Sequence, residues 1–320
     1  MERWLVTGAA GFIGSHVAEA LLRRGYDVKG LDNYATGYRR NVEAAIARSN
    51  GAGRFEMIEG DIADPGVCAL ACRDVGRIVH LAALGSVPRS MKDPLVTFSS
   101  NQQGFVNMIT AAKDAGVRRF VYASSSSVYG DEPDLPKVEE RIGRPLSPYA
   151  LSKRSNEETA ELYTRIFGMQ CIGMRYFNVF GPRQDPEGAY AAVIPRWFDA
   201  LRRKERPVIY GDGSTSRDFC YVENVVEANL LAATADDAGA FGEAFNIACE
   251  QRTTLNELFA MIREISGADP GIEPIYEDFR PGDVKHSLAS VDKARRLLGY
   301  EPRVQVREGL QRAAAWYLQS

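Results

Sequence analysis

The chain has 320 residues, of which 45% are hydrophobic and 25% are charged, and these proportions exclude wholesale disorder. Lys and Arg number 39 against 42 Asp and Glu, so the net charge of −3 offers no broad cationic face for nucleic acid or anionic lipid. No apolar run approaches the ~20 residues of a membrane span, and a strand pattern begins by Trp4, which leaves no room for a signal peptide. We therefore expect a cytoplasmic protein without nucleic-acid or membrane partners.

Predicted strands and helices alternate along the first half of the chain. Strands are predicted over residues 3–7, 27–31, 54–58, 77–81, 118–123 and 170–175, and helices over 13–24, 94–115 and 148–167. This order predicts an α/β fold of the Rossmann type, with a doubly wound parallel sheet covered by helices on both faces. Cys68 and Cys72 lie four residues apart in another predicted helix, but no second pair completes a metal site. We expect buried free thiols and no metal.

After Asn178 the alternation thins, and Gly and Pro clusters separate short elements. We expect this part to be a smaller C-terminal cap built onto the sheet. Residues 1–178, joined by parts of 209–250, would form the sheet domain. Residues 179–320 would form mainly the cap, and the two regions would interleave.

A glycine-rich turn follows the first predicted strand and opens the first helix. Gly8 permits a tight turn, Gly11 lets the backbone approach a pyrophosphate, and Gly14 allows close packing of helix and strand. The N–H groups at the start of the helix then face the phosphates. A glycine triplet alone is a weak signal, but its place between a strand and a helix is typical of a dinucleotide-binding site.

Asp32 ends the second strand at the distance expected for a carboxylate that binds the adenine ribose, and it would repel a 2′-phosphate. This favours NAD over NADP, although Arg39 and Arg40 follow closely and leave NADP open. Asp61 follows the third strand, where it could reach the adenine amino group. The other cofactor contacts that we expect around these turns are Phe12, Ile13, Asn33, Ile62, Leu81, Ala82, Ala83 and Ser124.

Tyr149 and Lys153 lie four residues apart at the start of a predicted helix, so they share one face. A tyrosine with a pKa of ~10 is a poor base at neutral pH, but the Lys153 ammonium and a nicotinamide ring would both lower that pKa. The pair alone is a common pattern. It gains weight because the serine run 124–127 ends a preceding parallel strand, where its hydroxyls would face the same crevice.

These motifs together resemble the extended short-chain dehydrogenases/reductases, in the nucleotide-sugar epimerase/dehydratase group. The glycine turn, the serine run, the Tyr149/Lys153 pair, and the segments 175–178 (RYFN) and 280–283 (RPGD) occur in that group's order. The resemblance implies that Tyr149 takes the proton of a sugar 4-hydroxyl, assisted by Ser125, while a hydride passes from C4 to NAD. It further implies that Lys153 holds the nicotinamide ribose. Asn101, Tyr176 and Phe177 would contribute to the cofactor site.

Missing carboxylates narrow the reaction. The dehydratases and decarboxylases that the chain resembles carry acidic residues in the serine-run region, whereas this chain has Ser126-Ser127-Val128. Elimination and decarboxylation are therefore disfavoured, and epimerisation at C4 with tightly bound NAD is expected. A non-catalytic NAD-binding module on the same fold is the alternative from another class, and the retention of Ser125, Tyr149 and Lys153 argues against it.

Three segments, at residues 85–90, 184–195 and 214–219, resemble bacterial UDP-N-acetylglucosamine 4-epimerases. The resemblance places the sugar among Ser86, Ser125, Ser126, Ser127, Asn178, Ala192 and Ser287, and the UDP against Val193, Tyr210, Arg217 and Arg280. Epimerases that prefer UDP-glucose carry a bulky Tyr at the position of Ser287, so a serine would leave room for an acetamido group. UDP-glucose and UDP-glucuronate remain alternative substrates. The resemblance also implies a homodimer formed by the helices over 94–115 and 148–167.

Overall fold

The computed structural model describes residues 2–185, 192–279 and 285–319, and its centre is a seven-stranded parallel sheet. The strand order is β11-β6-β5-β4-β1-β2-β3, which is the doubly wound arrangement predicted from the sequence with one strand added at an edge. The strands are β1 (Arg3–Thr7), β2 (Asp27–Asp32), β3 (Phe55–Glu59), β4 (Arg77–His80), β5 (Arg119–Ser125), β6 (Gln170–Tyr176) and β11 (Ala244–Ile247).

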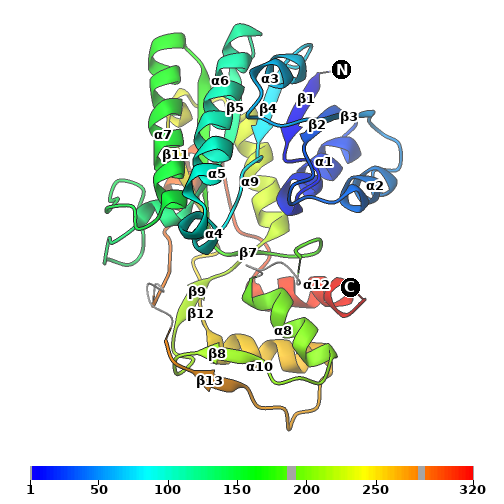
Figure 1. Cartoon of the computed structure of the whole chain (residues 1–320), viewed down its shortest axis with the longest axis vertical. Helices are drawn as coiled ribbons and strands as arrows, with labels where there is room; N and C mark the ends of the chain where they lie inside the picture. Colours follow the sequence, from blue (N-terminus) through cyan, green and yellow to red (C-terminus); the bar gives the residue numbers. More distant parts are fainter. Residues whose placement is uncertain (1, 186–191, 280–284, 320) are drawn as a thin grey trace.

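Helices cover both faces of this sheet (Figure 1). On one face lie α1 (Phe12–Arg23) and α9 (Val222–Thr234), whose buried side chains share a core with β1, β6 and β11. On the other face lie α3 (Pro65–Ala71), α6 (Gly104–Asp114) and α7 (Pro148–Phe167), which share a second core with β4 and β5. Both strand faces are buried because each core draws on alternate residues of the same strands.

A smaller cap lies below the sheet in Figure 1. Its core joins α8 (Val193–Arg202), α10 (Leu255–Ser266) and α12 (Val306–Gln319). Three strand pairs complete it: β7 (Val179–Phe180) with β10 (Cys220–Tyr221), β8 (Val208–Tyr210) with β13 (Ile275–Glu277), and β9 (Ser216–Asp218) with β12 (Arg252–Thr254). The chain enters the cap after β6, returns to the sheet through α9 and β11, and then contributes α10 to the cap. Three short helices lie elsewhere in the chain: α11 (Asp292–Leu298), η2 (Ser126–Tyr129) and η3 (Ala238–Ala240).

The helix predicted over 94–115 begins where expected, because Asp93 and Pro94 start a new helix after α4 (Val87–Lys92), but it is divided further along. The Asp93 side chain accepts a hydrogen bond from the Val96 N–H and so caps α5 (Pro94–Phe98). A π-helical turn, η1 (Ser99–Gln103), then separates α5 from α6. Such turns are frequent at functional sites, and this one contains Asn101.

The helix predicted around Cys68 and Cys72 is α3, although Cys72 lies just beyond its last residue. In contrast, α2 (Arg39–Arg48), α4, α8, α9, α10, α11 and α12 were not predicted from the sequence. All five cysteines are free and buried, as predicted. Burial raises the pKa of the Cys68 and Cys72 thiols to about 12, so both stay protonated at neutral pH. Of the helices in the described ranges, none is long and apolar enough to cross a membrane.

Candidate active site

The candidate site lies along the carboxyl edge of the sheet, where the parallel strands end. Gly8 follows β1, Asp32 ends β2, Gly60 follows β3, Leu81 follows β4 and Ser125 ends β5. All five positions line cavities or contact residues that do, as expected for the crevice of a doubly wound sheet.

The glycine turn fits a dinucleotide because its glycines have no room for side chains. A Cβ on Gly14 would lie 2.0 Å from the Gly8 carbonyl oxygen, so α1 passes directly over the turn. Gly8 has a φ of +68°, and its N–H donates to the Leu31 carbonyl at 2.8 Å. No side chain caps the start of α1, so its first N–H groups are available to a phosphate.

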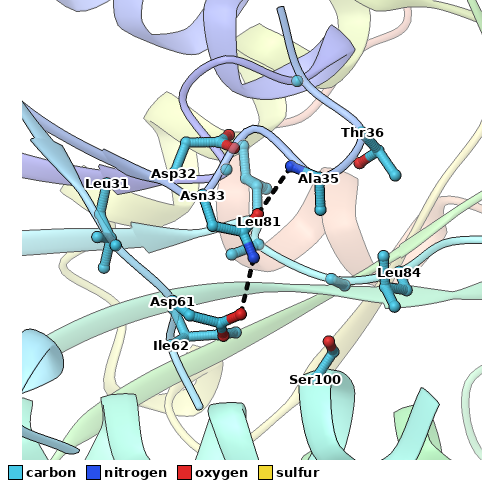
Figure 2. Close-up of a pocket in the computed structure, with 15 residues that line it drawn as sticks. Leu31, Asp32, Asn33, Ala35, Thr36, Asp61, Ile62, Leu81, Leu84 and Ser100 are labelled. Atoms are coloured by element: carbon cyan, nitrogen blue, oxygen red, sulfur yellow. Dashed lines mark hydrogen bonds between the residues drawn. The ribbon is translucent and has the colours of Figure 1, made fainter. Parts of the chain in front are cut away.

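The first cavity beside this turn holds three of the predicted polar contacts (Figure 2). Asp32 is fixed by the N–H groups of Ala10 at 2.9 Å and Tyr34 at 2.7 Å. Burial raises the pKa of the Asp32 carboxyl, while these hydrogen bonds favour its charged form. The Asn33 amide donates to the Asp61 carboxylate at 2.8 Å. The predicted contacts Ile62, Leu81, Ala82 and Ala83 also line this cavity.

Arg39 and Arg40, the two arginines that could have favoured NADP, make contacts away from this cavity. The guanidinium of Arg39 pairs with Glu59 at 2.7 Å and lies over the ring of Tyr34. Arg40 lies over the ring of Tyr38, 4.5 Å from its centroid. The 2′-phosphate of NADP would therefore be repelled by the Asp32 carboxylate, and neither arginine is placed to neutralise it. This agrees with the preference for NAD.

A second cavity of about 310 Å³ continues from the glycine turn to the predicted catalytic residues. Ser124, Tyr149, Lys153 and Tyr176 line it, together with Phe12, Ile13 and the three glycines. The Ser125 side chain lies near the Tyr149 hydroxyl and lowers its pKa. The structure therefore brings the predicted catalytic trio to the end of the predicted cofactor cavity.

The pKa values of Tyr149 and Lys153 differ from the sequence-based expectation. Removal from water raises the pKa of Tyr149, and the nearby Ser125 side chain offsets this in part. Lys153 is 4% exposed and donates to the Ala123 carbonyl at 2.8 Å. Its burial lowers its own pKa to about 8. The expected lowering of the Tyr149 pKa by the protein's own groups was wrong, because desolvation outweighs the effect of this partly desolvated ammonium.

Two other predicted contacts are buried beside this cavity. Asn101 is 1% exposed, and its side chain accepts from the Leu84 N–H at 2.7 Å and donates to the Leu84 carbonyl at 3.1 Å. This exchange fixes the backbone after β4 against the cofactor cavity. Phe177 packs in the core against Tyr129, with ring centroids 6.0 Å apart, whereas its neighbour Tyr176 reaches the cavity.

A third cavity, of about 260 Å³, lies in the cap. Five of the residues predicted to bind substrate line it: Asn178, Ala192, Val193, Tyr210 and Arg217. They come from four separate stretches of the chain, and Tyr210 and Arg217 lie in the strands β8 and β9 of the cap. Arg280 lies outside the described residues.

Ser287 belongs to a hydrogen-bonded cluster next to this cavity. Its hydroxyl accepts from the Asp218 N–H at 3.2 Å and from the Asn178 amide at 3.3 Å. Ser86 caps the start of α4 and accepts from the Arg89 N–H, and Ser127 has a buried hydroxyl without a hydrogen-bond partner among the described residues. The half-buried Ser126 lies between Ser125 and Ser127 at the end of β5. The serine run, Asn178 and Ser287 thus lie between the cofactor cavity and the cap.

Sequence reasoning missed a hydrogen bond that crosses the cofactor cavity. The Tyr38 hydroxyl donates to the Asp185 carboxylate at 2.5 Å, and both residues line the second cavity. They lie 147 positions apart, in loops after β2 and β7. No local motif marks such a pair, because only the fold brings the two loops together.

Comparison with known proteins identifies this geometry. Residues 4–248 match the sequence model of the NAD dependent epimerase/dehydratase family. A putative UDP-glucose 4-epimerase of Methanocaldococcus jannaschii is 36% identical over 98% of this chain and 97% of its own length. The UDP-N-acetylglucosamine 4-epimerase of Methanobrevibacter ruminantium M1, solved with UDP-N-acetylmuramic acid, has a TM-score of 0.91 at 35% identity and covers 99% and 98% of the two chains. The UDP-glucuronic acid 4-epimerase of Bacillus cereus, solved with UDP-glucuronic acid and NAD, has a TM-score of 0.89 at 30% identity and covers 99% of both chains.

Proposed function

Because the chain belongs to the NAD-dependent epimerase/dehydratase family, we propose that it is a UDP-sugar 4-epimerase whose preferred substrate is UDP-N-acetylglucosamine. Relatives that match nearly its whole length carry the names of UDP-glucose and UDP-glucuronate 4-epimerases, and one structural neighbour is a UDP-N-acetylglucosamine 4-epimerase. The activity as an NAD-dependent 4-epimerase of UDP-sugars is common to them and is the activity of this chain. The choice among the three sugars is the proposal.

One arrangement carries the proposal: the Ser125, Tyr149 and Lys153 side chains lie where the cofactor cavity ends and the serine run begins. The serine run supplies hydroxyls and no carboxylate. A general acid at C6 or a base at C5, which elimination would need, has no candidate in that run. The site therefore supports proton transfer at a single sugar hydroxyl.

The protein's own residues have separate tasks in this chemistry. When bound, NAD supplies reversible acceptance of a hydride from sugar C4. Tyr149 is the group that takes and returns the 4-hydroxyl proton, and Ser125 lies near its hydroxyl. Lys153 supplies a positive charge that favours the phenolate. The cap holds the UDP moiety, with Arg217 as one of two described arginines in its cavity wall, the other being Arg196, and Tyr210 as a ring suited to uracil.

The choice of sugar rests on Ser287. Its hydroxyl accepts a hydrogen bond from Asn178, which lines the cap cavity. A serine side chain is smaller than the tyrosine that the family resemblance places here in epimerases preferring UDP-glucose, and on this ground we propose that the site admits an acetamido group at sugar C2. UDP-glucose is the second candidate, because a serine here also admits a hydroxyl. UDP-glucuronate is the third, because the serine run suits a carboxylate as well.

A direct assay tests the proposal. Purified protein is incubated with each of UDP-N-acetylglucosamine, UDP-glucose and UDP-glucuronate, without added NAD or reductant, and the 4-epimers are separated by chromatography. We expect epimerisation of all substrates that turn over to proceed without net redox change, with the highest kcat/KM for UDP-N-acetylglucosamine. A higher kcat/KM for either other sugar would refute the proposed preference. Stoichiometric consumption of NAD would identify a net dehydrogenase instead.

We further propose that two copies of the chain form a homodimer through α5 and α7, which pack against each other at one side of the sheet (Figure 1). Large apolar side chains on these helices face solvent. Leu95 is 81% exposed and Ile166 is 59% exposed. Apolar patches of this kind commonly mark interfaces. Ile109 on α6, which belongs to the helix predicted over 94–115, is instead buried in the protein's own core.

Light scattering at micromolar concentration tests the dimer. Wild-type protein should have twice the mass of one chain, and Leu95→Glu combined with Ile166→Glu should halve it, because two charges would be buried in the interface. Leu70→Glu serves as the matched control: Leu70 is 45% exposed on α3, away from these helices, so the dimer should persist. A wild-type monomer contradicts the proposal.

A further inference from the structure

A buried carboxylate connects the cofactor cavity with the protein core. Glu157 lies one helical turn after Lys153 on α7, and its side chain is 10% exposed. Its Oε1 accepts a hydrogen bond from the hydroxyl of Ser124, which lines the cofactor cavity. Glu157 is not among the residues that line this cavity, so the chemistry described above does not account for it.

Arg175, near the end of β6, fixes this carboxylate with two hydrogen bonds. Its Nε donates to Glu157 Oε1 at 2.9 Å, and its Nη2 donates to Oε2 at 2.8 Å. The third nitrogen, Nη1, donates to the Tyr129 hydroxyl at 3.1 Å and to the Glu139 carbonyl at 3.0 Å. Bidentate pairing leaves the carboxylate one orientation. Replacing a buried ion pair with apolar residues is often neutral for stability, so stability alone does not explain this pair.

The same carboxylate acts on Lys153. Residues four apart on a helix share a face, and Glu157 raises the pKa of the Lys153 ammonium against the lowering by burial. The other titratable groups around Glu157 and Lys153 add little charge that could replace the effect of Glu157 on Lys153. His80 on β4 is held neutral because burial lowers its pKa to about 3, and burial raises the pKa of Tyr122 on β5. Tyr149 lies one turn before Lys153, and Arg175 is already engaged by Glu157.

We propose that Glu157 is a positioning residue of the epimerase reaction: held by Arg175, its carboxylate fixes the Ser124 hydroxyl at the wall of the cofactor cavity and stabilises the positive charge of Lys153 beside Tyr149. The inference rests on the proposed epimerase activity but not on the identity of the sugar.

The test compares Glu157→Gln, which keeps the shape and removes the charge, with Glu157→Asp, which keeps the charge. In Glu157→Gln we expect kcat to fall roughly 10- to 100-fold with little change in KM. The alkaline limb of the kcat–pH profile should move to lower pH, because Lys153 loses its proton more readily without the carboxylate. Glu157→Asp should restore that limb. Glu161→Gln, in an exposed pair with Arg165 on the same helix, is the control and should change neither quantity.

Two further measurements separate positioning from simple stabilisation. The fraction of purified protein that carries NAD, measured by absorbance after denaturation, should fall in Glu157→Gln because Ser124 is released. The double variant Glu157→Gln/Arg175→Gln removes both charges, so its thermal stability should exceed that of the single variant while kcat and the pH limb stay altered. If kcat recovers together with stability, or if the single variant keeps the wild-type pH limbs, the proposal is overturned.

Failure of the proposed function is distinguishable from failure of this inference. Wild-type protein that turns over none of the three UDP-sugars would refute the function. The NAD content of Glu157→Gln then decides the cofactor half of the inference by itself: a reduced content supports it, and an unchanged content overturns it.

Discussion

The phenol of Tyr149 lies between Ser125 and the cofactor cavity, and burial raises its pKa above the ordinary tyrosine value. A base with a raised pKa depends strongly on the positive charges near it. Lys153 supplies one such charge, but at a pKa of about 8 it loses much of it just above neutral pH. We infer that the two residues must be tuned together, because a neutral lysine would leave the phenol protonated.

Tyr149→Phe tests the role of the hydroxyl. The substitution keeps the ring and removes the proton-transfer group, so kcat should fall by ~10²- to 10⁴-fold while KM barely changes. Steady-state kinetics with the best UDP-sugar measure both. Tyr163→Phe is the matched control on the same helix, since its hydroxyl contacts only Thr110 at 2.8 Å among the bonds of the described residues. Near-normal turnover by Tyr149→Phe would remove this residue from the mechanism.

Ser287 allows a sharper test of sugar choice. A tyrosine at this position should exclude the acetamido group sterically, so the ratio of kcat/KM for UDP-N-acetylglucosamine to that for UDP-glucose should fall roughly 10- to 100-fold. The two hydrogen bonds that Ser287 accepts from Asp218 and Asn178 could also be lost. Ser287→Ala isolates that loss, because it removes the hydroxyl without adding bulk. If Ser287→Tyr lowers kcat/KM for both substrates equally, Ser287 does not select the sugar.

At the scale of elements, the junction of β1 and α1 sets the cofactor cavity. Gly14→Ala would place a Cβ 2.0 Å from the Gly8 carbonyl oxygen, which is backbone and cannot move without opening the turn. We expect NAD affinity to fall at least ~10-fold, equivalent to ~1.4 kcal/mol, with a lower thermal midpoint. Gly271→Ala is the control, since its Cβ would meet the Asp269 side chain at 3.3 Å. Wild-type NAD content in Gly14→Ala would show that the turn tolerates the displacement.

Elements with strong local patterns were predicted well from the sequence. Six of the seven strands of the sheet were placed within a residue or two because their apolar runs are buried on both faces, whereas β11 was not predicted; α7 was predicted with its observed bounds. In contrast, α2 was not predicted, because it is largely polar and shows no clear apolar stripe. The π-helical turn at Asn101 was missed because its bonds to Leu84 come from another element.

The candidate site divides in the same way. The cofactor residues follow strand ends, so the sequence predicts their proximity directly. The cap residues Asn178, Val193, Tyr210 and Arg217 have no local signal and were expected only through the family resemblance. Glu157 was missed because one glutamate on a long helix resembles any solvated residue until Arg175 is known to face it. Long-range pairing is the information that a local pattern lacks.

At the scale of the whole molecule, the sheet buries a histidine that resists protonation. His80 is 4% exposed, and its Nδ1 lies 2.8 Å from the Thr7 hydroxyl. That hydroxyl also accepts from the N–H groups of Leu81 and Ala82, so the network fixes the backbone beside the glycine turn. Burial lowers the pKa of His80 from 6.5 to about 3. The folded protein therefore contains a neutral imidazole that the unfolded chain would protonate.

The consequence is a loss of stability in mild acid. Between pH 6.5 and about 3 the unfolded chain binds a proton at this histidine that the folded state does not, so the free energy of unfolding falls as the pH falls. From pH 7 to pH 5 this amounts to about 2 kcal/mol. Asp218 acts in the opposite direction, because burial raises its pKa from 3.8 to about 6 and the folded state takes up a proton there first. His16, with a pKa lowered to about 3, acts in the same direction as His80.

Substitution of His80 separates its contribution to the pH dependence of stability from the contributions of Asp218 and His16. His80→Asn keeps an acceptor for Thr7 and removes the titrating ring, so the variant should be less stable at pH 7 but should lose about 2 kcal/mol less than wild type on going to pH 5. Urea unfolding of both proteins at pH 5, 6 and 7 measures the difference. His286→Asn is the comparison: burial and the charges of Arg252 and Arg217 also lower the pKa of this half-buried ring, so its removal should change the slope in the same direction but by less than His80→Asn. Parallel pH dependences for wild type and His80→Asn would mean that the imidazole is protonated in the folded state, and that the network at Thr7 reorganises to accept the charge.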